Sequence, residues 1–146
     1  TMPAVDCRLP RLPMSATAPT PSDDPRVLLV FTNMPDHDSA TALATALVEA
    51  RLVACVNVLA ACTSVYRWQG AVETAGEVPV LMKTTVARYA ALEAAIRARH
   101  PYELPEIVAV PVEHGLPAYL DWVADETGVR TRSARIDRVR RRRFHH

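Results

Sequence analysis

The sequence predicts one α+β domain of the split β-α-β, or ferredoxin-like, type. Over residues 26–128, short apolar runs typical of strands alternate with segments of helical period in the order β-α-β-β-α-β-α. Two β-α-β crossovers therefore enclose a hairpin, and this order folds into an antiparallel sheet of four strands with both crossover helices on one face. No internal repeat interrupts the pattern, which indicates a single domain.

The first strand and the first helix have the plainest patterns. Residues 27–32, VLLVFT, form a short β-rich run bounded by turn-forming residues, which indicates a buried strand. Residues 35–52 follow with Asp36 or Asp38 available as the N-cap of a helix. The apolar stripe of this helix is expected from four residues at helical spacing: Leu43, Ala46, Leu47 and Ala50.

The middle of the chain predicts a long hairpin. Its strand-like segments are VACVNVL at 53–59, TSVYRW at 63–68 and AVETAGEVPVLMKTT at 71–85. We expect a kink around Ala60–Cys62, where the first two segments meet, and a turn at Gln69–Gly70. Gly76 and Pro79 indicate a bulge or an exposed edge in the long third segment.

The remaining elements are a helix at 86–99, a strand at 106–112 and a helix at 116–127. Thr85 is placed to be the N-cap of the first of these helices. Pro117 suits the first turn of the last helix, and Gly128 is placed to end it.

Charge and composition separate the two ends from this domain. Residues 1–25 hold six of the twelve prolines and no sustained period, so we expect a disordered leader. Residues 129–146 form a basic, arginine-rich tail that repels itself and buries little. The formal charge of the chain is +1, but the eight arginines and one aspartate after residue 129 carry +7, which leaves −6 for the rest.

The cysteines and the apolar runs bound the location of the protein. Its three cysteines, Cys7, Cys55 and Cys62, form no Cys-x-x-Cys pair, which favours neither a disulfide framework nor a zinc knuckle and favours a reducing cytoplasm. No apolar run reaches about 18 residues, and we therefore expect no membrane span.

Helices on one face of a sheet leave the other face to solvent or to a partner. The hairpin residues Val65, Trp68, Val78 and Val80 fall on that side in one phase of the strand pattern or another, and they are too apolar for a free edge. We therefore predict self-association, with edge strands pairing between subunits.

Several short motifs together resemble the CutA family, the divalent-cation tolerance proteins. They are Ala54-Cys55-Val56-Asn57, Tyr66-x-Trp68-x-Gly70, Glu77-Val78, Lys83-Thr84-Thr85 and His100-Pro101-Tyr102-Glu103-x-Pro105-Glu106. The likeness covers about residues 27–126. It implies a ferredoxin-like homotrimer locked by its long hairpins, with pockets between subunits near the His-Pro-Tyr segment and divalent metal, copper above all, as the ligand.

The chain departs from the family pattern at the metal site that the resemblance implies. That pattern has a cysteine on the first strand and paired histidines before the proline. Here the strand offers Phe31-Thr32-Asn33, and the pair is Arg99-His100. Arginine has no free lone pair, so one imidazole of the pair remains and we expect weak binding of copper or zinc.

The candidate metal ligands are His100, Glu103, Glu106 and Cys55. Imidazole and carboxylate groups suit copper or zinc, and a thiolate suits soft metals. The alternative for His100 is a helix end, because the residue before proline avoids the helical region. The glutamates can instead pair with arginines of another subunit or act as general acid and base, and Cys55 can be a small buried hydrophobe.

Further residues are expected to line the pocket or the subunit interface: Tyr66, Trp68, Lys83, Arg99 and Tyr102. The two aromatics share one face of their strand and suit interface packing or stacking on a ligand. Lys83, the only lysine, needs a partner such as Glu103 or Glu106, or an anionic ligand, unless it reaches solvent.

The function that these patterns favour is a non-enzymatic, trimeric divalent-cation tolerance protein that needs no obligatory cofactor. Phosphate-binding loops and the common hydrolase and metalloprotease motifs are absent from the sequence. The alternative is a trimeric signalling or scaffolding module that binds a small anion or a protein partner at Lys83 and Arg99. The aromatic residues are scattered, so specific nucleic-acid binding is not expected.

Overall fold

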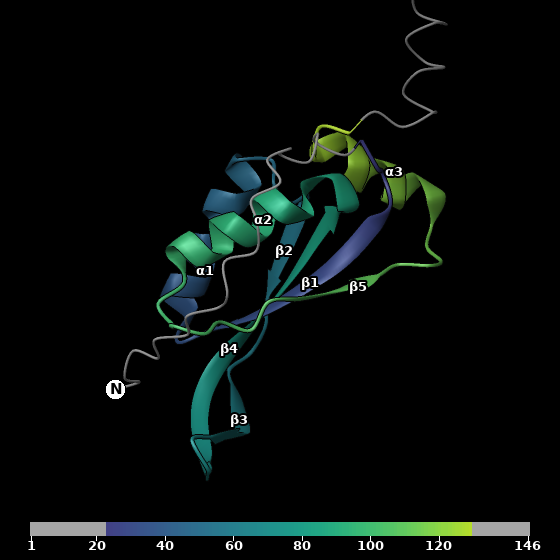
Figure 1. Cartoon of the computed structure of the whole chain (residues 1–146). Helices are drawn as coiled ribbons and strands as arrows, with labels where there is room; N and C mark the ends of the chain where they lie inside the picture. The colour runs from purple at the N-terminus through teal and green to yellow at the C-terminus, as the bar shows by residue number, and fades with distance from the viewer. Residues whose placement is uncertain (1–22, 130–146) are drawn as a thin grey trace, which may run out of the picture.

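The computed structural model describes residues 23–129. The predicted leader and the predicted arginine-rich tail lie almost wholly outside this range. The elements are β1 (Val27–Met34), α1 (His37–Glu49), β2 (Cys55–Val58), β3 (Cys62–Trp68), β4 (Ala71–Thr85), α2 (Val86–Arg99), β5 (Val108–Pro111) and α3 (Pro117–Glu126). Figure 1 shows their arrangement, with the β3–β4 hairpin projecting from the rest of the molecule.

The sheet is antiparallel, with the strand order β2-β4-β1-β5. The outer half of β4 leaves these strands and pairs with β3 alone. The α+β class and the antiparallel sheet are therefore confirmed. The alternation of strands and helices also follows the predicted order, with the second predicted strand divided into β2 and β3.

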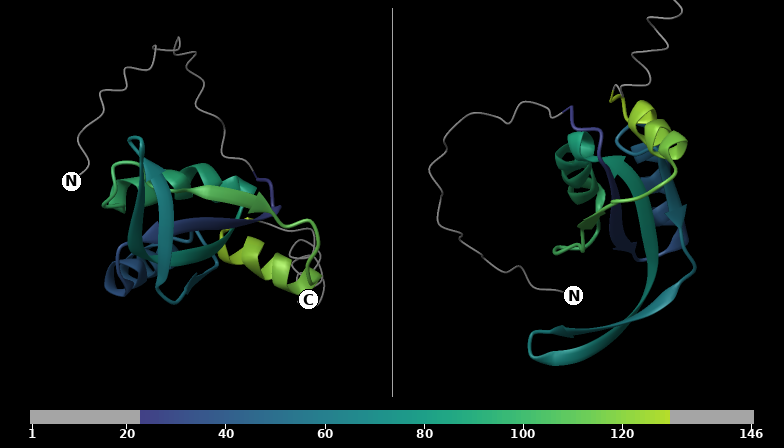
Figure 2. Two further views of the ribbon diagram at one scale, coloured as in Figure 1. Left: turned by 90° about the horizontal axis from the view of Figure 1, so that it is seen from below. Right: turned by 90° about the vertical axis from the view of Figure 1, so that its right-hand side faces the viewer.

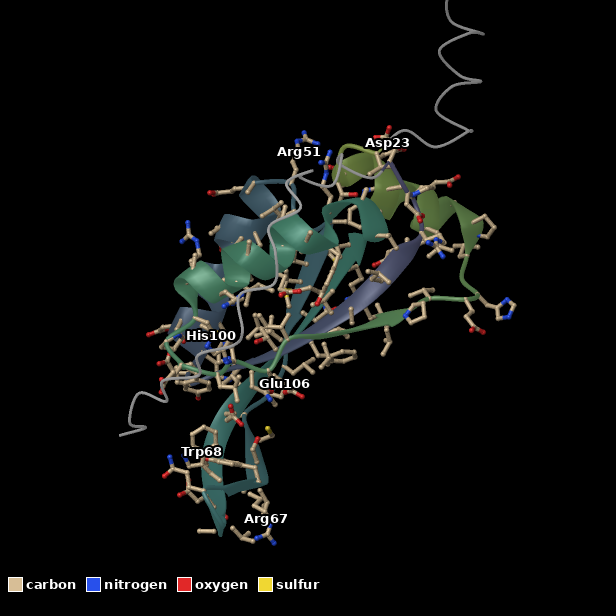
Figure 3. The ribbon with its side chains drawn as sticks, viewed as in Figure 1. Asp23, Arg51, Arg67, Trp68, His100 and Glu106 are labelled. Atoms are coloured by element: carbon tan, nitrogen blue, oxygen red, sulfur yellow. The ribbon has the colours of Figure 1, made fainter. Side chains whose placement is uncertain are left out.

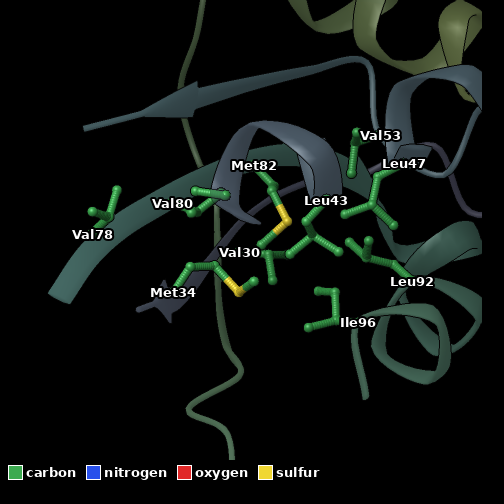
Figure 4. Packing of buried hydrophobic residues seen from close by; sticks show 11 residues of the cluster. Val30, Met34, Leu43, Leu47, Val53, Val78, Val80, Met82, Leu92 and Ile96 are labelled. Atoms are coloured by element: carbon green, nitrogen blue, oxygen red, sulfur yellow. The ribbon is translucent and has the colours of Figure 1, made fainter. Parts of the chain in front are cut away.

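Helices α1 and α2 cover one face of the sheet, as Figures 1 and 2 show. Alternate residues of β1 and β4 meet them in a buried cluster, drawn in Figure 4: Val30, Met34, Ala40, Leu43, Leu47, Val53, Val78, Val80, Met82, Leu92 and Ile96. Successive side chains of a strand point to opposite faces. Leu29, Phe31 and Leu81 therefore belong to the other face, which we call the open face.

Helix α3 packs on one end of the sheet, away from the hairpin (Figure 1). Its Val123 forms a second buried cluster with Val27 and Ala54, and Leu120 packs against it. None of the helices among residues 23–129 has the length and apolar character needed to cross a membrane.

The helix ends settle two expectations about caps. Asp36, rather than Asp38, caps α1, because its side chain accepts a hydrogen bond of 2.7 Å from Ser39 N–H. Thr85 occupies the N-cap position of α2, but its hydroxyl makes no capping bond there. Backbone carbonyls of Asp24 and Arg26 accept the hydrogen bonds of the first α2 amides instead.

The irregularity of the hairpin lies at the predicted kink between β2 and β3, and not at Gly76 or Pro79 of β4. β4 pairs with β1 without interruption from Val78 to Thr85, so Pro79 marks no bulge on that side. Between the pair Val58↔Val80 and the pair Cys62↔Glu77, three residues of the first strand face two of the second. The extra residue therefore lies in 59–61, where the kink was predicted, and shifts the register of β3 by one.

The open face and the hairpin are the apolar surfaces that the helices leave uncovered. Val78 and Val80 are buried against the helices, so they do not belong to the exposed side. Val65 and Val72, by contrast, are 66% exposed on the projecting hairpin. Val108 and Val110 of the edge strand β5 are also exposed.

Candidate functional site

The segment 100–106 forms a corner between α2 and β5, and it contains four of the predicted site residues. Helix α2 ends at Arg99, and His100 adopts an extended conformation with φ −76° and ψ 131°. Pro101 follows, and a residue before proline is pushed out of the helical region. The predicted helix end at His100 is therefore what the backbone adopts.

Both ring nitrogens of His100 have partners within the chain. A carbonyl oxygen only accepts, so Nε2 carries the proton and donates to Asn33 O at 2.8 Å. Nδ1 then accepts from Tyr102 N–H at 3.2 Å. The residue is 9% exposed, and burial lowers the pKa of its imidazole below the usual 6.5, although Asn33 O and the Glu77 carboxylate oppose this shift. The histidine is therefore held neutral in one tautomer.

Tyr102 packs beside this ring, with the two ring centroids 4.9 Å apart. Its pKa is raised by burial and by the carboxylate of Glu77, the residue at which β4 enters the hairpin. Tyr66 of β3 has a pKa raised by burial and by Glu73. The corner therefore contacts the base of the hairpin through the Tyr102 phenol and the Glu77 carboxylate.

Asn33 joins the corner to the end of β1. Its side-chain amide donates to Oε2 of Glu106 at 2.6 Å, while its carbonyl accepts from His100. The register of β1 and β5 pairs Phe31 with Val108, so Asn33 and Glu106 are the next two residues to face each other on the open face. The side-chain bond therefore continues the β1–β5 pairing where its backbone ladder ends. Figure 3 shows Glu106 where the hairpin leaves the sheet.

Cys55 and Lys83 lie opposite each other toward the other end of the open face. The Cys55 thiol is 3.6 Å from the Tyr119 hydroxyl of α3, and Lys83 donates a hydrogen bond to Asn57. Lys83 is four residues along β4 from Pro79, the pairing partner of Asn33, which corresponds to about 13 Å. Within one chain, Lys83 therefore bonds to Asn57 and lies away from the corner.

The structure brings some of the predicted site residues together and separates others. His100, Tyr102 and Glu106 meet at the corner, and Glu103 lies exposed in the same segment. Trp68 belongs to the hairpin, and Cys55 stands apart beside α3. Among residues 23–129, no three His, Cys, Asp or Glu side chains are grouped so that they could hold a metal ion.

Lys83 and Arg99 do not form one anion site in a single copy. Arg99 is exposed in the last turn of α2, the helix on the covered face, whereas Lys83 belongs to the open face. Two residues that contribute to the site were absent from the prediction, Asn33 and Glu77. The motif Glu77-Val78 was the sequence signal for Glu77. The proximity of Glu77 to Tyr102 depends on a long-range contact that the motif does not predict.

The fold and the corner together define a class of protein. It is a small α+β protein whose one-sided sheet carries a projecting hairpin, with a polar corner built by His100, Asn33 and Glu106 at the hairpin base. The family model described as CutA1 divalent ion tolerance protein matches residues 28–126. The chain belongs to the CutA1 family of divalent ion tolerance proteins.

Relatives and solved structures agree with this assignment. The divalent-cation tolerance protein CutA of Thermus thermophilus is 45% identical over 100 residues, which cover 68% of this chain and 97% of the relative. The human protein CutA is 39% identical over 118 residues, covering 76% and 66% of the two chains. Crystallised CutA from Xylella fastidiosa superimposes with a TM-score of 0.68 at 44% identity, over 70% of this chain and 98% of that one.

Proposed function

We propose that the chain is a non-enzymatic divalent-cation tolerance protein that assembles as a homotrimer and binds copper or zinc weakly at pockets between subunits. The observation that carries the assembly is the uncovered apolar surface. The open face presents Leu29, Phe31 and Leu81, each half-buried, beside the exposed Val108 and Val110. A patch of this kind marks a surface that meets a partner.

The projecting hairpin supports the same proposal. A two-stranded hairpin is marginally stable by itself in water, and β3 pairs with β4 alone. Its exposed Val65 and Val72 would lose water contact if another copy packed on them, which favours association.

Sedimentation equilibrium tests the assembly. The chain is expected to sediment as a trimer, and Phe31→Asp on the open face is expected to dissociate it because a buried unpaired carboxylate is costly. Val48→Asp, at a position 42% exposed on α1, is the matched control and should leave the trimer intact. A folded monomer at all concentrations would refute the assembly.

The geometry of His100 supports a weak metal site at the corner. A histidine that binds metal commonly donates its second ring nitrogen to a backbone carbonyl, as Nε2 of His100 does to Asn33. A metal at Nδ1 must first displace Tyr102 N–H, whose 3.2 Å contact is the longer of the two. This displacement lowers affinity. Glu103 and Glu106 are the proposed oxygen ligands, and assembly must bring them and His100 together, because residues 23–129 of one copy hold no such group of three.

Calorimetric titration with copper and with zinc tests the metal site. His145 and His146 are changed to alanine in every protein, so that adjacent terminal imidazoles do not chelate metal. His100→Ala is expected to abolish binding, whereas His114→Ala, at an exposed position, should keep it. The metal role is refuted if micromolar metal does not bind, or binds equally well to His100→Ala.

A further inference from the structure

The only lysine of the chain lies on the open face, in a polar cluster that the proposed metal site does not use. Lys83 of β4 pairs with Cys55 of β2 on one side and with Leu29 of β1 on the other. Asn57 lies two residues beyond Cys55 on the same face, and it accepts a hydrogen bond from the Lys83 ammonium. Tyr119 of α3 adds its hydroxyl, 3.6 Å from the Cys55 thiol. We call Lys83, Cys55, Asn57 and Tyr119 the lysine cluster.

The ammonium of Lys83 has a neutral partner in place of an anionic one. Asn57 Oδ1 accepts its hydrogen bond, and no carboxylate of residues 23–129 forms an ion pair with it. Lys83 is half-buried beside Leu29, and Leu81 is the next residue of β4 on the same face. A charge that is partly removed from water is stabilised by a counter-charge. The lysine cluster therefore lacks one negative charge.

The other members of the cluster supply hydrogen bonds without adding charge. Asn57 is exposed, and its amide nitrogen can donate while its oxygen faces Lys83. The Tyr119 hydroxyl contacts a thiol, and sulfur is a weak acceptor. That hydrogen bond and burial raise the pKa of Tyr119, so its phenol stays protonated and remains a donor. Ammonium, amide and phenol together offer several donors and a single positive charge.

The surroundings of the cluster select the kind of anion. A single positive charge is neutralised by a monocarboxylate, whereas a phosphate group carries close to two negative charges. Phosphate sites also use arginine forks or helix N-termini, and neither belongs to the cluster. Leu29, Leu81 and Phe31 continue the open face from Lys83, and all three are half-buried. They offer an apolar floor to a hydrocarbon chain attached to the carboxylate.

We propose that the lysine cluster binds a small monocarboxylate, with the carboxylate on Lys83 and the attached hydrocarbon chain on Leu29 and Leu81. The Tyr119 hydroxyl exchanges its thiol partner for a carboxylate oxygen, which is the stronger acceptor. The site shares no residue with the corner at His100. It is built within one copy, so it does not rest on the proposed trimer or on the proposed metal site.

The single lysine gives a direct probe of the site in the full chain. Lysine labelled with carbon-13 at Cε adds one side-chain signal, that of Lys83. Titration with sodium butyrate, against sodium chloride at equal ionic strength, is expected to shift this signal to saturation. Acetate should need about tenfold more for half-saturation, because it lacks two methylene groups that butyrate packs on the leucines. Inorganic phosphate should not displace butyrate at the half-saturating concentration of butyrate.

Variants separate the charge of the cluster from general effects. Asn57→Asp places a carboxylate beside Lys83 with almost no change of shape, so it should abolish butyrate binding while the chain stays folded. Tyr119→Phe removes only the hydroxyl and should weaken binding about fivefold. Arg99→Met removes an exposed cation from α2, on the covered side, and should leave binding unchanged. Circular dichroism verifies that each variant is folded.

The outcomes bear on the site itself. A Lys83 signal that butyrate does not shift, or that phosphate shifts at a lower concentration, would overturn the monocarboxylate site. Binding that survives Asn57→Asp, or that is lost in Arg99→Met, would overturn its location. A Lys83 signal moved by Glu106→Gln and unmoved by butyrate would show that a carboxylate of a second copy occupies the cluster instead. Sedimentation and calorimetry test the trimer and the metal site separately, so either can fail while this site stands.

Discussion

Two buried threonines on the covered face of the sheet differ in their hydrogen bonds. Thr84 donates its hydroxyl hydrogen to Leu52 O at 2.7 Å. Thr32 is 1% exposed, and its Oγ1 has no hydrogen-bond partner within residues 23–129. Removing a satisfied buried hydroxyl and removing an unsatisfied one have opposite effects on stability.

Thr32→Val is therefore expected to stabilise the protein by about 1 kcal/mol, because valine has the same shape and no polar atom to desolvate. Thr84→Val should destabilise it by about 1–2 kcal/mol, since Leu52 O loses its donor. Urea unfolding of both variants at one protein concentration measures the difference. Equal effects of the same sign would show that Thr32 has a partner in solution.

His100 makes stability depend on pH. Its folded pKa lies below the usual 6.5, so between these two values the unfolded chain binds more protons than the folded one. Stability is therefore full above about pH 6.5 and falls as the pH falls through 6.5 toward the lowered pKa. His100→Gln is expected to remove this dependence, whereas His114→Gln should keep it; urea unfolding from about pH 7.5 to pH 5.5 measures both.

At this scale the sequence predicted the position of single residues better than their contacts. The helix end at His100 follows from Pro101, a neighbour in the chain. The bonds of His100 to Asn33 and of Asn33 to Glu106 join residues 67 and 73 positions apart. A local sequence pattern does not indicate which side chains far apart in the chain will meet in the fold.

Among the elements, α3 is attached by polar contacts at its C-terminal end as well as by its buried apolar cluster. Thr127, at its C-terminal end, is fully buried and donates to Val123 O or Ala124 O, and its Oγ1 lies 3.3 Å from Thr85 Oγ1. The Arg88 side chain of α2 donates to Thr127 O at 2.6 Å. A cation at the C-terminal end of a helix is favourable for the helix dipole.

Gly128 allows this attachment through its backbone. It has φ +76°, a left-handed conformation, and an added Cβ would lie 3.0 Å from Arg88 Nη2. Gly128→Ala is expected to cost about 1–2 kcal/mol from the backbone conformation, and the displaced arginine adds to that cost. Gly76→Ala is the control, because its Cβ would meet nothing within 4 Å; thermal unfolding compares the two.

All of the predicted elements form, because their signals are local: apolar period, caps and turn residues. The sites of disagreement have physical reasons. β5 is shorter than 106–112 because its backbone ladder stops at Phe31↔Val108. Gly76 and Pro79 suggested a bulge or an exposed edge in β4. The partner strand contains the extra residue, whereas the expected edge is present at Gly76, because residues 71–77 of β4 pair with β3 alone.

For the whole molecule, the uneven distribution of charge along the chain determines where polyanions are expected to bind. Residues 130–146 carry +7 and the rest of the chain carries −6. Retention on a polyanion such as heparin is therefore expected to come from the tail alone. Deleting residues 130–146 should abolish retention and leave thermal unfolding unchanged, and persistent retention would place a polyanion site in the domain.

The open face is the part of the whole molecule that the sequence anticipated and could not resolve. Helices on one side predicted an apolar surface on the other, and this surface is present. Val78 and Val80 nevertheless belong to the covered side, because the phase of β4 is fixed by its pairing with β1. The side of the hairpin that carries Val65 depends in turn on the register of β3.

The extra residue at 59–61 separates two stretches of pairing that are fixed independently. A chain lacking Ala60 would set two residues opposite two, and Cys62 would still pair with Glu77, because the turn that follows Trp68 determines how β3 and β4 align. The deletion would therefore remove a local bend and leave each side chain of β3 on its present side. A one-residue change in the turn itself would instead exchange the two sides of the hairpin.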